Sequence, residues 1–348
     1  MAKTQVVGLD IGDTQLRAVE LAMDTRDPFR SAAIQRYAEM DLVPDSVRDG
    51  EVVRGAEVAD ALKRLWSTRR FATKDVIIGL GGQRVVVREA TFPAAPLDAL
   101  RMSLPFTVQD MIMVPVDQSQ LDFYPLAETD GKVSGLLVAA PNEVVQHNVD
   151  AVLDAGLRPA GVDLGAFALT RALARGQFQQ GIVGIVDVGA DMTTLVVAQG
   201  GQPMIMRILP TGGRLITDQI ARTLGIPAPR AEQLKIEVAL MNPGEGNEPA
   251  HSTFAVVAEK CQALVEQVAR TFSFYAQSSG QSVGHVLISG RGGMLNGLGQ
   301  YISTALRLPA SFSALDSNFT IQKPAQAMTP EQRMSLPVAV GLAMGVAK

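Results

Sequence analysis

Apolar and polar positions along the chain follow one pattern twice, about half a chain apart. In residues 6–19 and again in residues 184–197, an apolar run ends in Asp-x-Gly, a few polar residues follow, and an apolar run resumes. This pattern predicts two strands joined by a tight turn. Aligning Asp10 with Asp187 superposes the glycines and the apolar runs of both stretches. The repeat predicts two lobes of related build that face each other across a cleft, unless both are unrelated hairpins of the core.

The remaining pattern predicts how the chain is divided. Apolar residues at helical spacing predict helices over residues 57–71, 97–109, 142–155 and 253–277, whereas residues 41–55 have no regular pattern and predict a loop. Short strands on both sides of the helix at residues 97–109, followed by the helix at residues 142–155, predict a small α/β unit inserted in the first lobe. We therefore expect a first lobe with its inserted unit, a second lobe, and an apolar helix that returns to the interface between the lobes: residues 1–180 (with 84–155 inserted), 181–335 and 336–348.

Composition narrows the class of protein. A chain of 348 residues with 47% apolar and 19% charged residues is long enough for two well-buried α/β domains. A net charge of -4, with no Lys/Arg-rich run, argues against nucleic-acid binding. The single Cys261 leaves no disulfide within the chain and suits a reducing compartment. With no signal peptide and no apolar stretch of the roughly 20 residues that a membrane helix needs, we expect a cytoplasmic protein that meets membranes only through partners.

The two hairpins carry the candidate chemistry. Asp10 and Asp187 each lie at the end of a strand, where a carboxylate could hold a metal ion through water. The glycine two residues later lets the amides of the turn approach an anion, and Arg17 returns on the next strand towards the same anion. Opposed phosphate loops with an acid at each root predict a cleft for a nucleotide-metal complex.

Two later stretches fit the same cleft. Residues 211–213, Thr-Gly-Gly, open a helix whose first amides would point into the cleft and favour a negative charge. Residues 289–295 form a glycine-rich turn that permits close approach of a flat ligand such as a nucleobase. A turn that only packs tightly would have the same sequence, so this second signal leaves both explanations open.

The order of these motifs resembles that of the actin-like ATPases, and the details resemble the type IV pilus assembly protein PilM family, which is related to the division protein FtsA. The resemblance spans nearly the whole chain, and these stretches carry it: Val7-Gly8-Leu9-Asp10-Ile11-Gly12, Val162-Asp163 with Phe167-Ala168-Leu169, Asp187-Val188-Gly189-Ala190 with Thr193-Thr194, Gly212-Gly213-Arg214-Leu215-Ile216-Thr217, and Ala231-Glu232 with Lys235. It implies a two-lobed α/β fold of the actin-like, ribonuclease H-like ATPase type, with a small α/β subdomain inserted in the first lobe as in FtsA.

The resemblance also implies ATP and Mg2+ in the cleft between the lobes. The metal would lie at Asp10 and Asp187. The residues implied to contact the nucleotide are Gly12, Asp13, Thr14, Arg17, Gly189, Ala190, Asp191, Thr193, Gly212, Gly213, Glu232, Lys235, Gly290, Arg291 and Gly292. The implied function is a cytoplasmic scaffold of type IV pilus assembly that docks the N-terminal cytoplasmic tail of a PilN-like inner-membrane protein. Such a scaffold would meet other pilus assembly components and be recruited to the inner face of the cell membrane.

Several departures from the pattern of the family bear on turnover. Asp13 and Asp191 stand where PilM-like sequences usually have hydroxyl side chains, so each places a carboxylate near the phosphates unless it points to solvent. Mg2+ or Arg17 would have to offset these charges. Gly165-Ala166 replaces a Glu-Pro pair and cannot do acid-base work, and Arg291 replaces a glycine of the adenosine turn. These changes predict a protein that binds nucleotide with weak or no hydrolysis.

Three other functions stay open at this point. A small-molecule kinase of the same fold would need a carboxylate base near the acceptor hydroxyl, for which Asp163 is a candidate. An FtsA-like division filament would polymerise with ATP. A nucleotide-free interaction module would gain no thermal stability from ATP and Mg2+.

Overall fold

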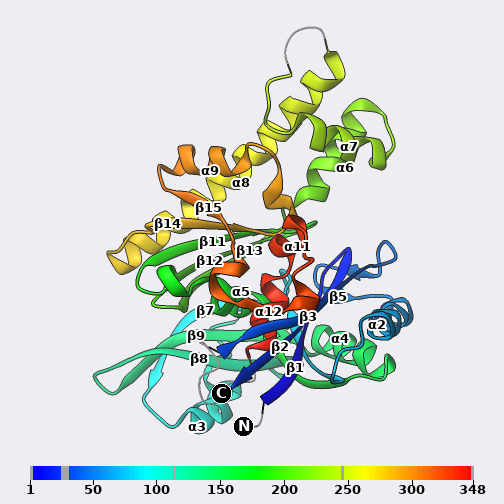
Figure 1. The fold of residues 1–348 in the computed structure, drawn as a ribbon. Coiled ribbons are helices and arrows are strands. Elements are labelled where there is room, and N and C mark those ends of the chain that lie inside the picture. Colours follow the sequence, from blue (N-terminus) through cyan, green and yellow to red (C-terminus); the bar gives the residue numbers. More distant parts are fainter. Residues whose placement is uncertain (1–2, 25–30, 113, 244–246, 346–348) are drawn as a thin grey trace.

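The computed structural model describes residues 3–24, 31–112, 114–243 and 247–345, and it confirms an α/β fold with two lobes, drawn one above the other in Figure 1. Each lobe has a mixed sheet at its centre. The strands of the first-lobe sheet are β1 (Lys3–Ile11), β2 (Gln15–Asp24), β3 (Ala33–Asp41), β6 (Asp75–Leu80), β10 (Arg158–Leu164) and β16 (Thr320–Ile321). Those of the second-lobe sheet are β11 (Ile182–Val188), β12 (Thr193–Gln199), β13 (Gln202–Leu209), β14 (His285–Ser289) and β15 (Ala310–Phe312).

The two sheets share one topology over five strands, to which the first sheet adds β16 at its edge. The spatial order is β10-β6-β1-β2-β3-β16 in the first lobe and β15-β14-β11-β12-β13 in the second. In each, three strands form an antiparallel meander, and the first of them pairs in parallel with a later strand on its other side. The turns match as well, because the amide of Gly12 donates to Gln15 O at 3.0 Å and that of Gly189 to Met192 O at 2.9 Å. Both predicted hairpins are confirmed, and the repeat in the sequence is a repeat of structure.

Two short helices fill the space between the sheets (Figure 1). Helix α5 (Gly165–Leu173) packs on β11, β12 and β13, helix α12 (Pro337–Ala343) packs on β1, β2 and β6, and the two helices pack on each other. Glycines allow this close approach. A Cβ atom at Gly341 would lie 1.8 Å from Ala168 O, and one at Gly8 would lie 1.9 Å from Ala339 O. Residues 346–348, the end of the predicted closing helix, lie outside the described residues.

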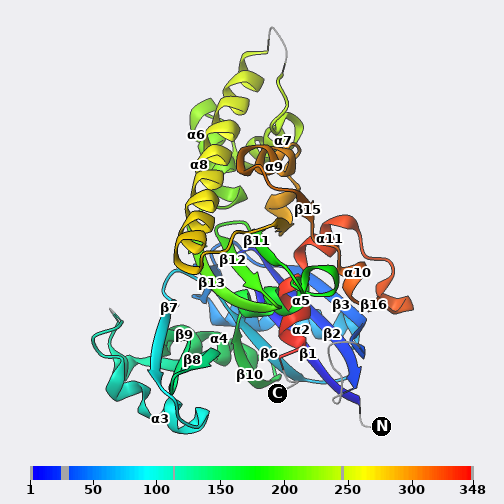
Figure 2. The ribbon, with the colours of Figure 1, turned by 90° about the vertical axis from the view of Figure 1, so that its left-hand side faces the viewer.

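Longer helices cover the outer faces. The first sheet is covered by α2 (Gly55–Arg69) and α4 (Asn142–Asp154), and the second lobe carries α6 (Gly213–Leu224), α7 (Ala228–Val238), α8 (Glu248–Ser279) and α9 (Leu298–Leu306). Figure 2 shows α8 running past the sheet towards α6 and α7. It begins earlier than its apolar spacing predicts, because the side chain of Asn247 caps it by accepting a hydrogen bond from Ala250 N at 3.2 Å.

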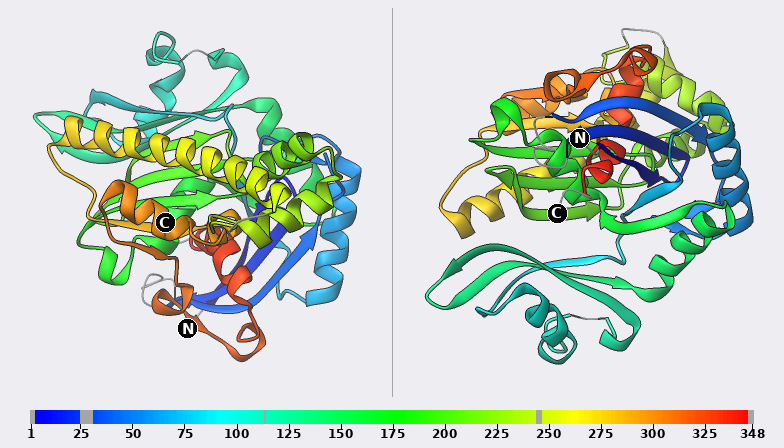
Figure 3. Two further views of the ribbon diagram at one scale, coloured as in Figure 1. Left: turned by 90° about the horizontal axis from the view of Figure 1, so that it is seen from above. Right: turned by 60° about the horizontal axis from the view of Figure 1, so that its bottom comes forward.

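The inserted unit has a sheet and a core of its own. Strands β7 (Val86–Pro93), β8 (Ser119–Thr129) and β9 (Lys132–Pro141) pair in the order β7-β9-β8, and helix α3 (Leu97–Thr107) shares their core, where Phe92 and Phe123 meet edge to face at 5.1 Å. Figure 3 shows this unit standing apart from the first-lobe sheet. Helix α4 packs instead on α2, with Ala151 and Val152 in the first-lobe core. We therefore propose that the inserted unit ends with β9.

Short elements complete the fold. The strands β4 (Val47–Arg48) and β5 (Glu51–Val52) form a hairpin within residues 41–55, where the sequence predicts a loop. Strands of two residues are too short to show alternation. The other short elements are α10 (Leu315–Asn318), α11 (Pro330–Ser335) and the 3-10 turns η1 (Val116–Gln118), η2 (Gly176–Phe178), η3 (Arg291–Met294) and η4 (Lys323–Ala325). Over the described ranges, no helix combines the length and the apolar character needed to cross a membrane.

Candidate functional site

A cleft of about 930 Å³ lies between the lobes and is lined by residues of both hairpin turns. Most residues predicted for the site line it: Asp10, Asp13, Thr14, Arg17, Asp187, Gly189, Ala190, Gly212, Gly213, Glu232, Lys235, Gly290, Arg291 and Gly292. Gly12, Asp191 and Thr193 do not. Gly12 closes its turn through its amide, and Thr193 is fully buried and donates to Thr211 O at 2.6 Å. Asp191 is bonded to a neighbouring helix, as described below.

Asp10 and Asp187 lie in the wall of this one cleft and repel each other. The pKa of Asp187 is raised to about 6: burial and the charge of Asp10 raise it, whereas a hydrogen bond from Ser289 and the charge of Arg17 lower it. Burial likewise raises the pKa of Asp10, against the opposing charge of Arg17. Two buried carboxylates of this kind are stabilised by a divalent cation, because its charge offsets both their desolvation and their mutual repulsion.

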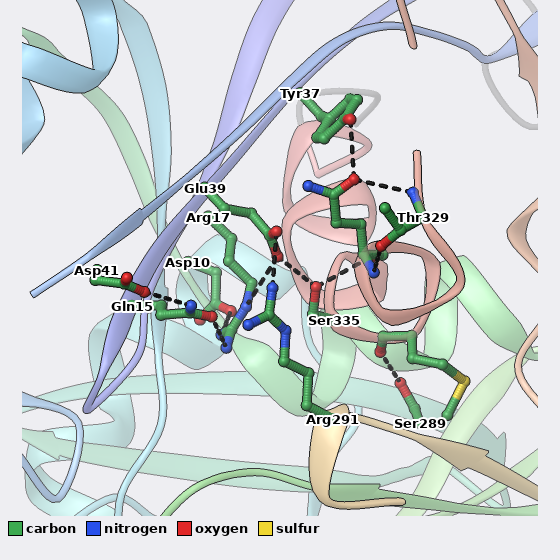
Figure 4. Close-up of polar contacts among 12 residues, drawn as sticks. Asp10, Gln15, Arg17, Tyr37, Glu39, Asp41, Ser289, Arg291, Thr329 and Ser335 are labelled. Carbon is green, nitrogen blue, oxygen red and sulfur yellow. Dashed lines mark hydrogen bonds and ion pairs between the residues drawn. The ribbon is translucent and has the colours of Figure 1, made fainter. Parts of the chain in front are cut away.

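A row of alternating charges runs from Asp10 across the first sheet (Figure 4). The registers of β1, β2 and β3 place Asp10, Arg17 and Glu39 next to one another. Arg17 Nη1 donates to Asp10 Oδ2 at 3.1 Å, and Arg17 Nε lies 3.8 Å from Glu39 Oε1. Glu39 also accepts from Arg291 Nη2 at 2.9 Å and from Ser335 Oγ at 2.5 Å. Arg291 therefore joins the glycine-rich turn of the second lobe to the sheet of the first.

Asp13 is turned into the protein and is only 9% exposed. Its Oδ1 accepts a hydrogen bond at 3.2 Å from Gly50 N, in the turn between β4 and β5. The pKa of Asp13 is raised to about 6: burial and the charge of Asp191 raise it, whereas the bond from Gly50 and the charge of Arg214 lower it. The side chain does not point to solvent, so an ionised Asp13 adds negative charge where phosphates are expected.

The second hairpin turn packs onto the start of α6. Gly213 N donates to Gly189 O at 3.0 Å, and Arg214 N donates to Ala190 O at 2.8 Å. The expectation that these first amides point into the cleft is wrong, because the turn closes the start of the helix with its own carbonyl groups. Asp191 extends the contact, since both of its carboxylate oxygens accept from Arg214, from Nε and from Nη2.

Lys235 and Glu232 join α7 to α6. Lys235 is 8% exposed, and its Nζ donates to Gly213 O at 3.1 Å, Thr217 Oγ1 at 3.0 Å and Glu232 Oε2 at 2.7 Å. An ammonium group has three protons, so these bonds use the whole donor capacity of Lys235. The side chain of Glu232 is 46% exposed, which leaves this acid as the member of the cluster that can meet a ligand hydroxyl group.

The predicted glycines of the cleft are needed first by the packing of the chain on itself. Gly290 has φ +79°, and a Cβ atom there would lie 2.3 Å from Val188 O. A Cβ atom at Gly292 would lie 2.6 Å from Val188 Cγ1, and one at Gly212 would lie 2.3 Å from Ala190 O. Close packing against the second hairpin thus accounts for these glycines without a ligand.

The lining as a whole nevertheless fits a nucleotide with a divalent cation. One end is apolar and fits a flat base; it includes Ile216, Pro229, Ile236, Leu264, Met294 and Leu295, with Cys261, whose thiol pKa burial raises to about 12. The other end carries Asp10, Asp187 and both hairpin turns. In the part of the chain that the structure describes, no group of three or more His, Cys, Asp or Glu side chains could hold a metal ion. Mg2+ is commonly held by one or two carboxylates together with water and phosphate oxygens, which this pair of acids suits.

Several charged residues that line the cleft were not predicted from the sequence, among them Arg214, Asp218, Lys260 and Glu331, nor was Glu39, which pairs with Arg17 and Arg291. Glu39 lies in register with Arg17, but that register depends on the connection between β2 and β3, which no periodicity predicts. Arg214 directly follows the Gly-Gly pair that opens α6, so its position at a helix start beside the cleft was readable. Its pairing with Asp191 was not readable, because the two residues are far apart in the chain.

Comparison with known proteins agrees with this architecture. The family model described as type IV pilus assembly protein PilM matches residues 8–346. The solved PilM-PilN type IV pilus biogenesis complex contains a similar chain, 23% identical, with a TM-score of 0.85 and coverage of 100% of both chains. MreB5 of Spiroplasma citri, solved with bound ADP, is 11% identical with a TM-score of 0.53, over 97% of this chain and 94% of that one. The cell division protein FtsA of Borreliella burgdorferi is 19% identical over 266 residues, which is 70% of this chain but only 64% of that relative, less than two thirds of its length. The fold is actin-like.

Proposed function

Because the chain belongs to the type IV pilus assembly protein PilM family, we propose that it is an actin-like scaffold that docks the N-terminal cytoplasmic tail of a PilN-like inner-membrane protein. The observation that carries this proposal is the family match over residues 8–346, together with full-length likeness to the solved PilM-PilN complex. On this proposal the protein works in the cytoplasm, meets other pilus assembly components, and reaches the inner face of the cell membrane through its partner.

We also propose that the cleft binds ATP with Mg2+. Asp10 and Asp187 would hold the ion, which would supply positive charge against the acids and the phosphates. The apolar end would take the base, and Glu232 a ribose hydroxyl group. Helix α5 begins with Gly165 and Ala166, which carry no acid-base group, so we propose weak or no hydrolysis. Nucleotide then serves to stabilise or gate the scaffold.

One experiment with two arms tests the proposed function. In the first arm, a labelled N-terminal tail peptide of the PilN-like protein from the same organism is titrated with the full chain, and a scrambled peptide of the same composition is the control. Saturable binding of the tail alone is expected. Equal binding of the two peptides would overturn the scaffold proposal.

In the second arm, thermal unfolding is followed with ATP and Mg2+, with ATP and EDTA, and in the Asp187→Asn variant. ATP with Mg2+ is expected to raise the midpoint, since a ligand bound only by the folded state stabilises it. Asp187→Asn is expected to be at least as stable as the parent chain without ligand, because it removes a charge that burial opposes. It should nevertheless lose the shift with nucleotide. An unchanged midpoint in the parent chain would overturn the proposed nucleotide site. In a separate sedimentation experiment, pelleting of the protein with ATP would favour a division-type filament.

A further inference from the structure

Five cationic side chains line the described part of the cleft: Arg17, Arg214, Lys235, Lys260 and Arg291. Arg17 and Arg291 are tied to acids of the first sheet. Lys235 is buried in its cluster between α6 and α7, and Lys260 lies on α8 beside the apolar end, paired with a neighbouring glutamate. Arg214 lies beside the second hairpin turn. Its side chain is 34% exposed and lines the cleft, and it pairs with Asp191 of that turn.

Arg214 stands where both hairpin turns meet. It is the second residue of α6, and side chains on a helix lean towards its N-terminus, which places the guanidinium over the turns. Its charge interacts with Asp191 of the second turn and with Asp13 of the first. Since the amides of Gly213 and Arg214 are already bonded to the carbonyls of residues 189 and 190, the guanidinium of Arg214 is the charged group with which the start of α6 can meet an anion.

We propose that Arg214 contacts phosphate and that, without nucleotide, it is paired with Asp191. When a nucleoside triphosphate binds, the guanidinium leaves the carboxylate for the terminal phosphate, and the cleft therefore prefers a triphosphate to a diphosphate. This inference rests on the proposed nucleotide site and deepens it. The two residues of this ion pair have different roles: Asp191 positions the guanidinium, and Arg214 makes the contact with the phosphate.

The exchange has a simple physical basis. A guanidinium group binds a carboxylate and a phosphate with the same two-point geometry, so Arg214 can change partner without a change in its own shape. With the base at the apolar end, the last phosphate of a triphosphate would be the group nearest the hairpin turns. A diphosphate would end short of Arg214 and would leave its pair with Asp191 intact.

The test compares the affinities of ATP and ADP, each with Mg2+, by calorimetry in the full chain. Arg214→Gln is expected to weaken ATP about tenfold and to leave ADP nearly unchanged, the size of one charge-assisted contact. Asp191→Asn is expected to do the opposite and to tighten ATP several-fold, because it frees Arg214. Arg214→Lys should restore part of the preference. Asp75→Asn, which breaks the exposed pair with Arg158 outside the cleft, is the matched control and should change neither affinity.

The expected changes in ATP affinity have opposite signs in the two variants, which distinguishes a phosphate contact from a structural role. If the pair only held the turn in place, both Arg214→Gln and Asp191→Asn would weaken ATP binding. Provided that the parent chain binds nucleotide, either of two results overturns this inference and leaves the proposed function standing. One is an unchanged ratio of the affinities for ATP and ADP in Arg214→Gln, and the other is weaker ATP binding in Asp191→Asn. If neither the parent chain nor any variant binds ATP, the inference falls together with the nucleotide site. Unfolding midpoints measured without ligand identify any variant that is not folded, and Arg214→Lys then carries the test.

Discussion

Asp13 places a buried negative charge at the end of the cleft formed by the hairpin turns, where the proposed nucleotide would have its phosphates, and this charge has a cost for folding. The ordinary pKa of the carboxyl group is 3.8, and burial raises it to about 6 in the folded chain. The folded protein therefore holds the proton of Asp13 more tightly than the unfolded chain does. The stability that comes from this proton is complete below pH 3.8 and is lost as the pH rises through 6.

Asp13→Asn should accordingly stabilise the protein at neutral pH. The amide oxygen of Asn can still accept the hydrogen bond from Gly50 N, while the buried charge is gone. We expect a gain of about 1–3 kcal/mol in the free energy of unfolding above pH 7, which shrinks towards zero as the pH falls to about 4. Urea unfolding of both chains between pH 4 and pH 8 measures it. Asp45→Asn, at an exposed acid, is the control, and a gain that does not depend on pH would contradict the explanation.

At the scale of single residues, the sequence predicted contacts between residues that are close together in the chain. Asp10 and Arg17 face each other because a tight hairpin fixes their register. Glu39, which meets Arg17, Arg291 and Ser335, was not found, because its contacts join residues separated by connections of no fixed geometry.

At the scale of elements, the contact between α12 and α5 holds the lobes together. Residues 336–347 were readable as an apolar helix, and the structure buries most of α12 completely. The need for glycine inside that helix was not readable, because it arises from the backbone of α5 on the opposite side. The β4–β5 hairpin was missed for the same kind of reason: its turn is held by Asp13, by residues 81–82 and by α4, all remote in sequence.

Gly341→Ala should therefore be costly although alanine favours helices. The added methyl group would lie 1.8 Å from Ala168 O, so α12 and α5 must move apart. We expect a loss of about 1–3 kcal/mol in the free energy of unfolding, the range typical of overpacked cores. Gly55→Ala is the matched control, since a Cβ atom at this first residue of α2 has nothing within 4 Å. Similar stability of the two variants would show that the helices are not packed this closely.

At the scale of the molecule, the two-lobed architecture was the most predictable feature, because a duplicated hairpin leaves its mark twice in one chain. The relation between the lobes was less predictable. It depends on a few contacts across the cleft, of which the bond from Arg291 to Glu39 is one, and on helix α11, whose Ser335 reaches the same carboxylate. Glu39 thus forms an ion pair with Arg17 on β2 and accepts hydrogen bonds from the turn after β14 and from α11.

This convergence predicts an order of effects among variants of the row. Glu39→Gln removes the charge that faces Arg17, Arg291 and Ser335, and it leaves Arg17, which is 17% exposed, with less compensation. We expect a loss of about 2 kcal/mol in the free energy of unfolding and faster amide hydrogen exchange over residues 290–294 and 330–336.

Arg291→Met removes one donor whose side chain is 41% exposed, so its expected loss is smaller, at most about 1 kcal/mol, with the same segments exchanging faster. Arg270→Met, which breaks an exposed pair on α8, should leave these segments unchanged. If exchange rises in Glu39→Gln only within β3, the carboxylate stabilises its own sheet and does not join the lobes. If the exchange rate rises on both sides of the cleft, Glu39 both orients Arg17 and holds the second lobe against the first. Because Arg17 also pairs with Asp10, a ligand bound at Asp10 would then affect the contact between the lobes.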